Sequence, residues 1–339
     1  MALNDSSTAA PLEFVSVTKQ YPNAATAAID NLSFTVPAGE VCVLVGPSGC
    51  GKTTAMRLVN RMIDLTSGDI LIDDATIKGR STTELRRDIG YVIQHVGLFP
   101  HLTILKNISV VPKLLGWDRK RMNDRAHELL DLIGLPQEMG NRYPSQLSGG
   151  QRQRVGVARA LAADPPLMLM DEPFGAIDPI NRDRLQNEFL RLQREIRKTV
   201  VFVTHDIDEA IKMGDRIAIL REGGQLVQYD APANILADPA DDFVAQFVGA
   251  DRGLKRLALT RLDEIELEDA SVARQVAQAD TVSSDATLRD ALSAMMSDSM
   301  RPLLVVDGEG TPIGSVSIEL INKALRRGRT DAEPTASTT

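Results

Sequence analysis

Gly46-Pro47-Ser48-Gly49-Cys50-Gly51-Lys52-Thr53 is the most informative stretch of the sequence, because it matches the pattern G-x-x-x-x-G-K-[ST]. It follows the apolar run Val41–Val45 and precedes Thr53–Met62, which has helical spacing. Glycines let backbone N–H groups point inward around a phosphate, and the helix N-terminus adds partial positive charge. A plain glycine-rich turn would match by chance in about one chain in a hundred, so we favour a phosphate-binding loop.

Two side chains of this loop are expected to carry chemistry. Lys52 would bridge the β- and γ-phosphates of a nucleotide as a point charge, and Thr53 would offer its hydroxyl to Mg²⁺. The sequence therefore predicts ATP and Mg²⁺ as cofactors. The candidate nucleotide-binding residues in and directly after the loop are Gly46, Pro47, Ser48, Gly49, Cys50, Gly51, Lys52, Thr53 and Thr54.

A second apolar run, Leu167–Met170, ends in Asp171 and Glu172. Two carboxylates after a buried strand are costly unless they meet a cation at the strand's end. Asp171 would hold Mg²⁺, mostly through water, and Glu172 would act as the general base on the attacking water. Taken alone, this pattern is more often a strand leaving the core. Beside a phosphate-binding loop, we favour the catalytic interpretation.

Short apolar runs alternate with amphipathic stretches along most of the chain, which predicts an α/β fold with a largely parallel sheet and an antiparallel portion near the start. The strand candidates are Val41–Val45, Gly68–Ile72, Ile89–Ile93, Leu167–Met170, Val200–Val203 and Arg216–Leu220. The helix candidates are Thr53–Met62, Asp118–Ile133, Gln151–Ala163, Pro179–Ile196 and Ile207–Met213. The helix-rich stretch Asp118–Tyr143 is interpreted as part of an inserted helical subdomain.

The composition narrows the classes of function. The net charge of -8 argues against a nucleic-acid partner, because nucleic acids bind proteins through basic surfaces. The two cysteines, Cys42 and Cys50, argue against a disulfide framework and fit a reducing cytosol. No apolar run approaches ~18 residues, and Met1–Pro11 does not read as a secretory signal. Any membrane role is therefore expected to depend on other subunits.

Leu147-Ser148-Gly149-Gly150-Gln151 precedes a further helix-forming run. A serine hydroxyl and backbone N–H groups at a helix N-terminus form another anion site, although a simple helix cap is the plain alternative. One nucleotide seldom needs two phosphate sites in one chain. We therefore expect two chains arranged head-to-tail, each placing Ser148, Gly149, Gly150 and Gln151 over the other's ATP.

With these motifs in this order, the chain resembles the ATP-binding cassette (ABC) ATPases over Leu12–Val248. The resemblance implies that Tyr21 stacks on adenine and that His205 contacts the γ-phosphate. It also implies that Gln94 contacts Mg²⁺ or water, and that Asp178 lies in a loop crossing the dimer. Ile177 replaces the more usual leucine of that loop. The catalytic candidates are Glu172, His205 and Gln94, and the metal-ligand candidates are Thr53, Gln94 and Asp171.

Within that superfamily, Phe202–Lys212 and Phe247–Arg252 resemble the cassettes of osmoprotectant importers, which move quaternary amines such as glycine betaine, choline, carnitine or proline betaine. The resemblance implies a homodimer that meets two transmembrane permease subunits at the cytoplasmic face of the membrane, and indirectly an extracytoplasmic binding protein. Gln94–Trp117, with Leu98 and Phe99, would receive the permeases. The alternatives are a soluble cassette ATPase acting on nucleic acid or the ribosome, and the cassette of an exporter.

The end of the chain predicts a small α+β unit with the order β-α-β-β-α, which resembles a single cystathionine-β-synthase (CBS) module. In modules of this kind that bind adenine nucleotides, a Ser or Thr is followed three residues later by an aspartate that binds the ribose. Here Ser317 is followed by Leu320, so we do not expect a ribose contact at this position. We expect two copies to pair through an apolar sheet face that includes some of Leu304, Val306, Ile313 and Val316, near a basic cluster of Lys323, Arg326, Arg327 and Arg329.

These patterns together predict the domain limits. We expect a disordered start over 1–11 and an ATPase domain over 12–250, with its helical subdomain at about 95–150. A linker over 251–280, the CBS-like module over 281–327 and a disordered tail over 328–339 are expected to follow.

Overall fold

The computed structural model describes residues 9–93, 97–175, 177–270, 280–297 and 300–327. The chain divides into two compact units, Met1–Pro232 and Ala233–Thr339. Gln94, most of the segment expected to be disordered at the start, and the expected tail lie outside the described residues. The expected domain limits remain predictions.

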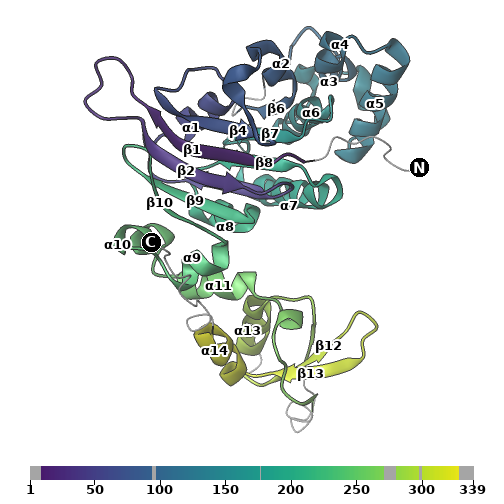
Figure 1. Cartoon of the computed structure of the whole chain (residues 1–339). Helices are drawn as coiled ribbons and strands as arrows, with labels where there is room; N and C mark the ends of the chain where they lie inside the picture. Colours follow the sequence, from purple (N-terminus) through teal and green to yellow (C-terminus); the bar gives the residue numbers. More distant parts are fainter. Residues whose placement is uncertain (1–8, 94–96, 176, 271–279, 298–299, 328–339) are drawn as a thin grey trace. The chain divides into compact units, whose positions relative to one another are not determined.

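A mainly parallel sheet forms the centre of the N-terminal unit (Figure 1). Among the described residues it has six strands in the order β10-β9-β3-β8-β7-β6. Only the pairing of β10 with β9 is antiparallel. The strands are β10 (Gln225–Asp230), β9 (Arg216–Arg221), β3 (Val41–Val45), β8 (Thr199–Val203), β7 (Leu167–Asp171) and β6 (Ile89–Val92). Every residue of β3 and β8 is buried, as expected for strands covered on both faces.

A second, antiparallel sheet has the order β2-β1-β4-β5. Its strands are β1 (Leu12–Lys19), β2 (Ile29–Val36), β4 (Ser67–Ile72) and β5 (Ala75–Thr76). Helix α1 (Lys52–Val59) shares one apolar core with both sheets: its Met56 and Leu58 belong to the same buried cluster as Phe14 of β1 and Leu44 of β3. This packing fixes the start of α1, and therefore the phosphate-loop motif, against the parallel sheet.

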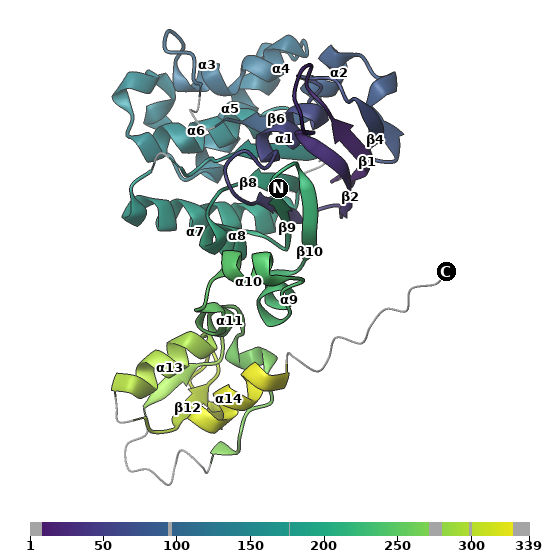
Figure 2. The same cartoon turned by 90° about the vertical axis from the view of Figure 1, so that its left-hand side faces the viewer.

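The helical part of the N-terminal unit lies away from the antiparallel sheet. In both views α3, α5 and α6 gather on the side opposite β1 and β2 (Figures 1 and 2). The helices are α3 (Ile104–Ile108), α4 (Val110–Leu114), α5 (Arg119–Leu132) and α6 (Gly149–Leu161), with short 3₁₀ turns at Gln137–Asn141 and Pro144–Gln146. The remaining helices are α2 (Thr82–Arg87), α7 (Pro179–Ile196) and α8 (Ile207–Met213), with a 3₁₀ turn at Ile77–Gly79.

The predicted α/β class, mixed sheet and helical segment are confirmed, and each strand and helix candidate corresponds to an observed element. One limit differs clearly. The first helix was expected to reach Met62 but ends at Val59, because Arg61 adopts a left-handed φ of 45° that a helix cannot contain.

The C-terminal unit contains the predicted β-α-β-β-α order. Its sheet has the order β11-β12-β13, with β11 parallel and β13 antiparallel to β12. These elements are β11 (Thr281–Ser283), α13 (Leu288–Ser297), β12 (Leu303–Val306), β13 (Pro312–Val316) and α14 (Ile318–Arg327). Preceding them are α9 (Pro232–Ala237), α10 (Asp242–Val248), α11 (Arg252–Leu259) and a 3₁₀ turn at Leu262–Glu264.

Part of the expected linker packs as core. Leu257 and Leu262 belong to the same buried cluster as Val305 and Ile321 of the module. Of the four residues named for the expected pairing face, Val316 is fully buried in that cluster and does not contribute to an exposed surface.

The other residues of the expected pairing face are partly accessible. Leu304 and Val306 are half-buried, and Ile313 is 49% exposed. Of the expected basic cluster, Lys323 is exposed, whereas the side chains of Arg326, Arg327 and Arg329 lie outside the described part of the chain. None of the helices in the described segments is long and apolar enough to span a membrane.

Candidate functional site

The phosphate-loop motif joins β3 to α1, as predicted. Gly51 caps α1 in a left-handed conformation (φ 97°) and provides no side-chain cap, so the first N–H groups of the helix are left for an anion. A methyl group on Gly51 would lie 2.4 Å from the carbonyl oxygen of Ala28, and one on Gly46 would lie 2.2 Å from that of Leu220. Only glycine fits at either position.

Lys52 is held inside the loop. Its Nζ donates to the carbonyl oxygens of Gly46 (2.8 Å) and Pro47 (3.0 Å), and the residue is only 7% exposed. The ammonium group is therefore already placed within the turn that would surround a phosphate. Because this ammonium group is partly shielded from water, it would attract a nucleotide phosphate more strongly than an exposed lysine would.

Thr53 and Asp171 lie together although 118 residues separate them in the sequence. The Thr53 hydroxyl donates to Oδ1 of Asp171 over 3.3 Å, because β7 lies two strands from β3 and ends at the same edge of the sheet. Burial raises the pKa of Asp171 above its usual value; the Thr53 hydrogen bond lowers it and the charge of Glu172 raises it further. A cation bound here would favour the ionised carboxylate.

The donor set fits Mg²⁺. Thr53 and Asp171 supply a hydroxyl and a carboxylate, the hard oxygen ligands that Mg²⁺ takes alongside substrate phosphates and water. Within the described residues, no group of three or more His, Cys, Asp or Glu could hold a metal. Gln94, the third predicted ligand, lies outside the described residues.

Glu172 and His205 meet at the ends of neighbouring strands. Because β7 and β8 are parallel partners, Oε1 of Glu172 lies 3.3 Å from Nδ1 of His205. The backbone of Glu172 has a left-handed φ of 43°, held in part by its N–H, which donates to the Val203 carbonyl (3.0 Å). The side chain of His205 is 62% exposed, so the pair faces solvent at the same sheet edge as Asp171.

Glu209 supports this edge and was not predicted as a site residue. It is buried on α8, and Oε1 accepts a hydrogen bond from Nε2 of Gln186 on α7 (2.9 Å). Burial raises its pKa, which hydrogen bonds from Thr204 and Gln186 oppose. The carboxylate therefore ties α7 to the loop that carries His205. Its only signal in the sequence is an acid in a helix's first turn, which a solvated helix shows equally well.

The Ser148–Gln151 run begins α6 and forms a reciprocal cap. The Ser148 hydroxyl accepts from the Gln151 N–H (3.3 Å), and Gln151 Oε1 accepts from the Ser148 N–H (2.9 Å). The run therefore does cap the helix, as the plain alternative expects. Ser148 and Gly149 are also exposed, so the cap leaves them accessible to a partner. Among the described residues, no hydrogen bond joins this run to the phosphate-loop motif of the same chain.

The other candidates are placed separately. Tyr21 is partly exposed, with the Nζ of Lys19 5.1 Å from its ring centroid. Asp178 caps α7 by accepting from the Asn181 N–H (3.2 Å). Neither contact tests a nucleotide role, so both roles remain predictions.

In the C-terminal unit, the side chain of Ser317 is bonded within the module. The Ser317 hydroxyl donates to Oε1 of Glu268 (2.8 Å) and accepts from the Leu320 N–H (3.1 Å). Glu268 is part of an added strand-like pairing, since its N–H and carbonyl bond Ser315. The Ser317 hydroxyl is therefore already bonded within the module, and Leu320 offers no carboxylate to a ribose.

Comparison with known proteins agrees with both units. The family model described as ABC transporter matches residues 29–175, and the CBS domain model matches residues 273–327. Over 290 residues the chain is 50% identical to the osmoprotectant import ATP-binding protein OsmV of Salmonella typhimurium. That match covers 85% of this chain and 74% of the relative.

Two further proteins extend the comparison. The glycine betaine/carnitine/choline transport ATP-binding protein OpuCA of Bacillus subtilis is 49% identical over 300 residues, or 88% of this chain and 77% of the relative. The dimeric, post-hydrolysis structure of the ATP-binding cassette MJ0796 with ADP and Pi is 35% identical, with a TM-score of 0.57. It covers 65% of this chain and 98% of the other.

Proposed function

Because the chain belongs to the ABC transporter family, whose ATP-binding cassettes are ATPases, we propose that it powers an importer of osmoprotectants such as glycine betaine, choline or carnitine. The observation that carries this proposal is the 290-residue match at 50% identity to an osmoprotectant import protein. That match is longer than the N-terminal unit, which ends at Pro232, so it extends into the C-terminal unit as well.

The site geometry supports the ATPase chemistry residue by residue. Lys52 binds the β- and γ-phosphates, and Thr53 and Asp171 are the residues that hold Mg²⁺. Bound Mg²⁺ neutralises charge that develops on the phosphates. Glu172 accepts the proton of the attacking water, and the imidazole of His205, 3.3 Å away, orients that carboxylate beside the γ-phosphate.

The partners follow from the same proposal. Two copies close head-to-tail, so that Ser148 and Gly149 of each complete the site of the other. The exposed Phe99, with half-buried Leu98, is offered to two permease subunits, which would hold the cassette at the cytoplasmic face of the membrane. An extracytoplasmic binding protein would meet the permeases alone.

The transported solute is tested in the reconstituted complex with its permeases and binding protein. We expect glycine betaine, choline or carnitine to raise the ATPase rate over the basal rate, whereas a neutral sugar and an unrelated amino acid do not. Equal stimulation by all solutes, or by none of the quaternary amines, would reject osmoprotectant import while leaving the ATPase assignment intact.

The shared sites predict a trapped dimer. The variant Glu172→Gln with ATP should sediment as a dimer, because the nucleotide bridges both chains and is not hydrolysed. Adding Ser148→Arg should return the protein to the monomer, since the long side chain on this exposed surface would occupy the space that the partner's ATP needs. Monomers alone for Glu172→Gln with ATP, with and without permeases, would contradict the head-to-tail arrangement.

The C-terminal unit is expected to regulate rather than catalyse. Removing residues 251–339, instead of cutting inside the core that contains Leu257 and Leu262, should leave basal ATPase activity unchanged. We expect the truncated complex to lose the dependence of transport on ionic strength. Salt screens charges over a Debye length of ~10 Å at 0.1 M, so contacts made by the basic cluster of the module would weaken as the salt concentration rises. The measurement is solute uptake across a salt series. Identical salt profiles for both complexes would exclude a sensory role.

A further inference from the structure

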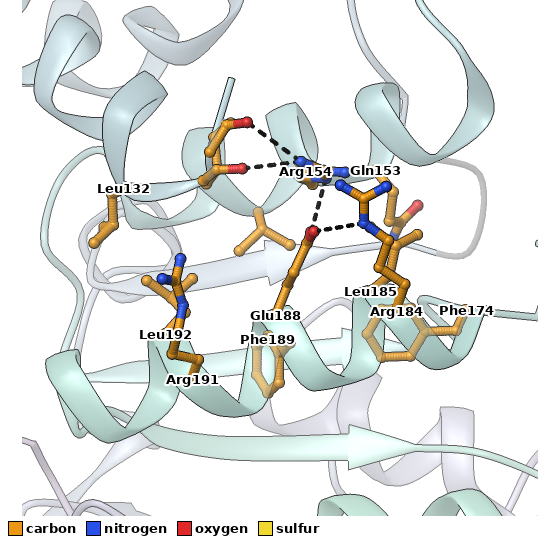
Figure 3. Close-up of a pocket in the computed structure, with 13 residues that line it drawn as sticks. Leu132, Gln153, Arg154, Phe174, Arg184, Leu185, Glu188, Phe189, Arg191 and Leu192 are labelled. Atoms are coloured by element: carbon orange, nitrogen blue, oxygen red, sulfur yellow. Dashed lines mark hydrogen bonds and ion pairs between the residues drawn. The ribbon is translucent and has the colours of Figure 1, made fainter. Parts of the chain in front are cut away.

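Arg154 on α6 connects three elements of the N-terminal unit. Its Nε lies 3.0 Å from Oε2 of Glu188 on α7, and its Nη1 lies 3.4 Å from the carbonyl oxygens of both Ile133 and Gly134, at the end of α5 (Figure 3). The Arg154 side chain is 17% exposed and that of Glu188 31% exposed. The two atoms meet as an ion pair at 3.0 Å without hydrogen-bond alignment, so the contact is electrostatic. Water screens this pair less than a surface pair, so the attraction favours keeping the two helices close together.

Glu188 has a second cationic neighbour, Arg184, which lies on the same helix. Nε of Arg184 lies 3.1 Å from Oε1 of Glu188, but both residues belong to α7 and the Arg184 side chain is 69% exposed. This pair joins two turns of one helix, so it cannot fix α7 relative to α6. It therefore provides a matched comparison for the pair that does bridge the helices.

The bridge lies beside a gap in the apolar packing. A pocket of about 120 Å³ lies between the end of α5, α6 and α7, with Leu132, Phe174 and Leu185 among its lining (Figure 3). Apolar side chains therefore do not fill the space between α6 and α7 completely, and close packing is what normally fixes the position of a helix. Where packing is incomplete, a polar bridge contributes more to the relative orientation of the helices.

Both bridged helices begin at residues proposed to face the partner protomer. Ser148 caps α6, and Asp178 caps α7. We propose that Arg154 and Glu188 are positioning residues, which hold α6 and α7 at one relative orientation so that both helix starts reach the partner protomer's nucleotide together. This inference rests on the head-to-tail dimer of the proposed function.

The test uses the full chain carrying Glu172→Gln, with dimer affinity measured by sedimentation in the presence of ATP. Adding Glu188→Gln removes the ion pair and keeps the side-chain shape. Both protomers must be aligned to associate, so if the aligned fraction falls to about one third, the dimer dissociation constant rises about tenfold. The affinity of the monomer for ATP should not change, because the phosphate-loop motif lies on other elements.

Three comparisons make the result specific. Arg184→Gln should leave the dimer dissociation constant unchanged. Arg154→Gln should weaken the dimer as Glu188→Gln does, and the double variant should fall short of the product of the two effects, since both act through one contact. Additive effects would overturn the inference.

A purely structural role predicts a different pattern. Glu188→Gln would then lower the melting temperature while the dimer dissociation constant, measured well below that temperature, stayed at the parent's value, and this outcome would also overturn the inference. If Glu172→Gln itself does not dimerise with ATP, the proposed function fails instead. Those two failures are therefore distinguishable.

Discussion

Glu172→Gln should reduce the rate of ATP hydrolysis by roughly 10²- to 10⁴-fold, which is the usual contribution of a positioned proton acceptor. The amide has the same shape as the carboxylate but cannot accept the proton of the attacking water. ATP affinity should be largely retained, because Lys52 and the backbone of the phosphate-loop motif are untouched. Phosphate release and equilibrium ATP binding, measured on the same preparation, separate the two effects.

The control for this variant is Glu195→Gln, a carboxylate exposed on α7 away from the sheet edge. It should hydrolyse ATP at the parent's rate. A Glu172→Gln protein that also hydrolysed ATP near that rate would remove Glu172 from the role of general base. The contact with His205 would then be a structural one.

Much of the parallel sheet could be predicted, because its strands are short apolar runs bounded by polar residues. Of the antiparallel sheet, only β4 was predicted with limits, and the rest was expected as an antiparallel portion near the start. Its β1 and β2 depart from strict alternation, since Ser16 and Asn31 have left-handed φ angles of 47° and 48° and the register shifts beside them. A bulge moves the buried face by one residue, and no period of two then spans the strand.

The candidate site divides in the same way. Contiguous motifs such as the one ending in Lys52 and Thr53 could be identified directly. The apolar run that ends in Asp171 and Glu172 was joined to that motif by its carboxylates, 118 residues from Thr53. The contacts of Glu209 with Gln186, and of Arg154 with Glu188, could not be predicted. Charged residues on amphipathic helices usually face water, and only the packed helices show which of them are buried against each other.

The C-terminal unit shows a related limit. The order of strands and helices followed from the apolar pattern, whereas the contribution of Leu257 and Leu262 to its core did not. The segment containing them is charged and weakly periodic, so its two buried leucines do not stand out from a linker. Burial of isolated apolar residues depends on what the rest of the chain places beside them.

Lys52→Met should weaken ATP binding by about 10- to 100-fold. A hydrogen bond to a charged group contributes about 1.5–3 kcal/mol, and ~1.4 kcal/mol corresponds to a factor of ten. Methionine keeps the apolar stem that is buried in the loop but removes the ammonium group and its bonds to Gly46 and Pro47. Titration of the protein with a fluorescent ATP analogue, at fixed salt and Mg²⁺, measures the change.

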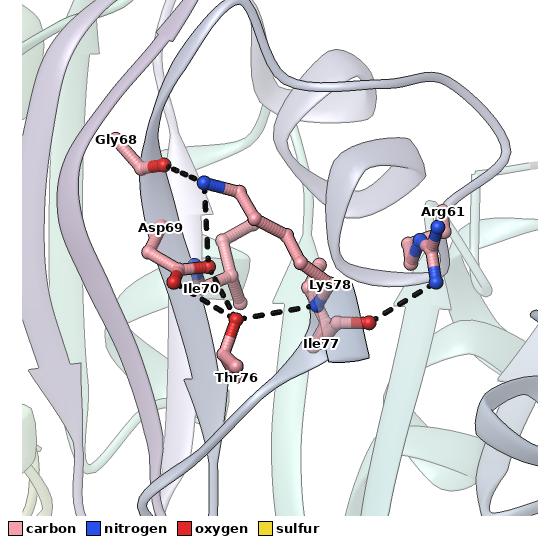
Figure 4. Close-up of polar contacts among 7 residues, drawn as sticks. All are labelled: Arg61, Gly68, Asp69, Ile70, Thr76, Ile77 and Lys78. Carbon is pink, nitrogen blue, oxygen red and sulfur yellow. Dashed lines mark hydrogen bonds and ion pairs between the residues drawn. The ribbon is translucent and has the colours of Figure 1, made fainter. Parts of the chain in front are cut away.

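Lys78→Met is the matched control. The Nζ of Lys78 also donates to a backbone carbonyl, that of Gly68 (2.6 Å), and lies 3.9 Å from Asp69 (Figure 4), but its side chain is 54% exposed. Its ATP affinity should equal the parent's, which would show that the loss in Lys52→Met comes from the charge within the phosphate-loop motif. Glu172→Gln and Lys52→Met then separate chemistry from binding: the first retains the nucleotide and the second releases it. Unchanged ATP affinity in Lys52→Met would mean that backbone N–H groups and the start of α1 hold the phosphates without this ammonium group.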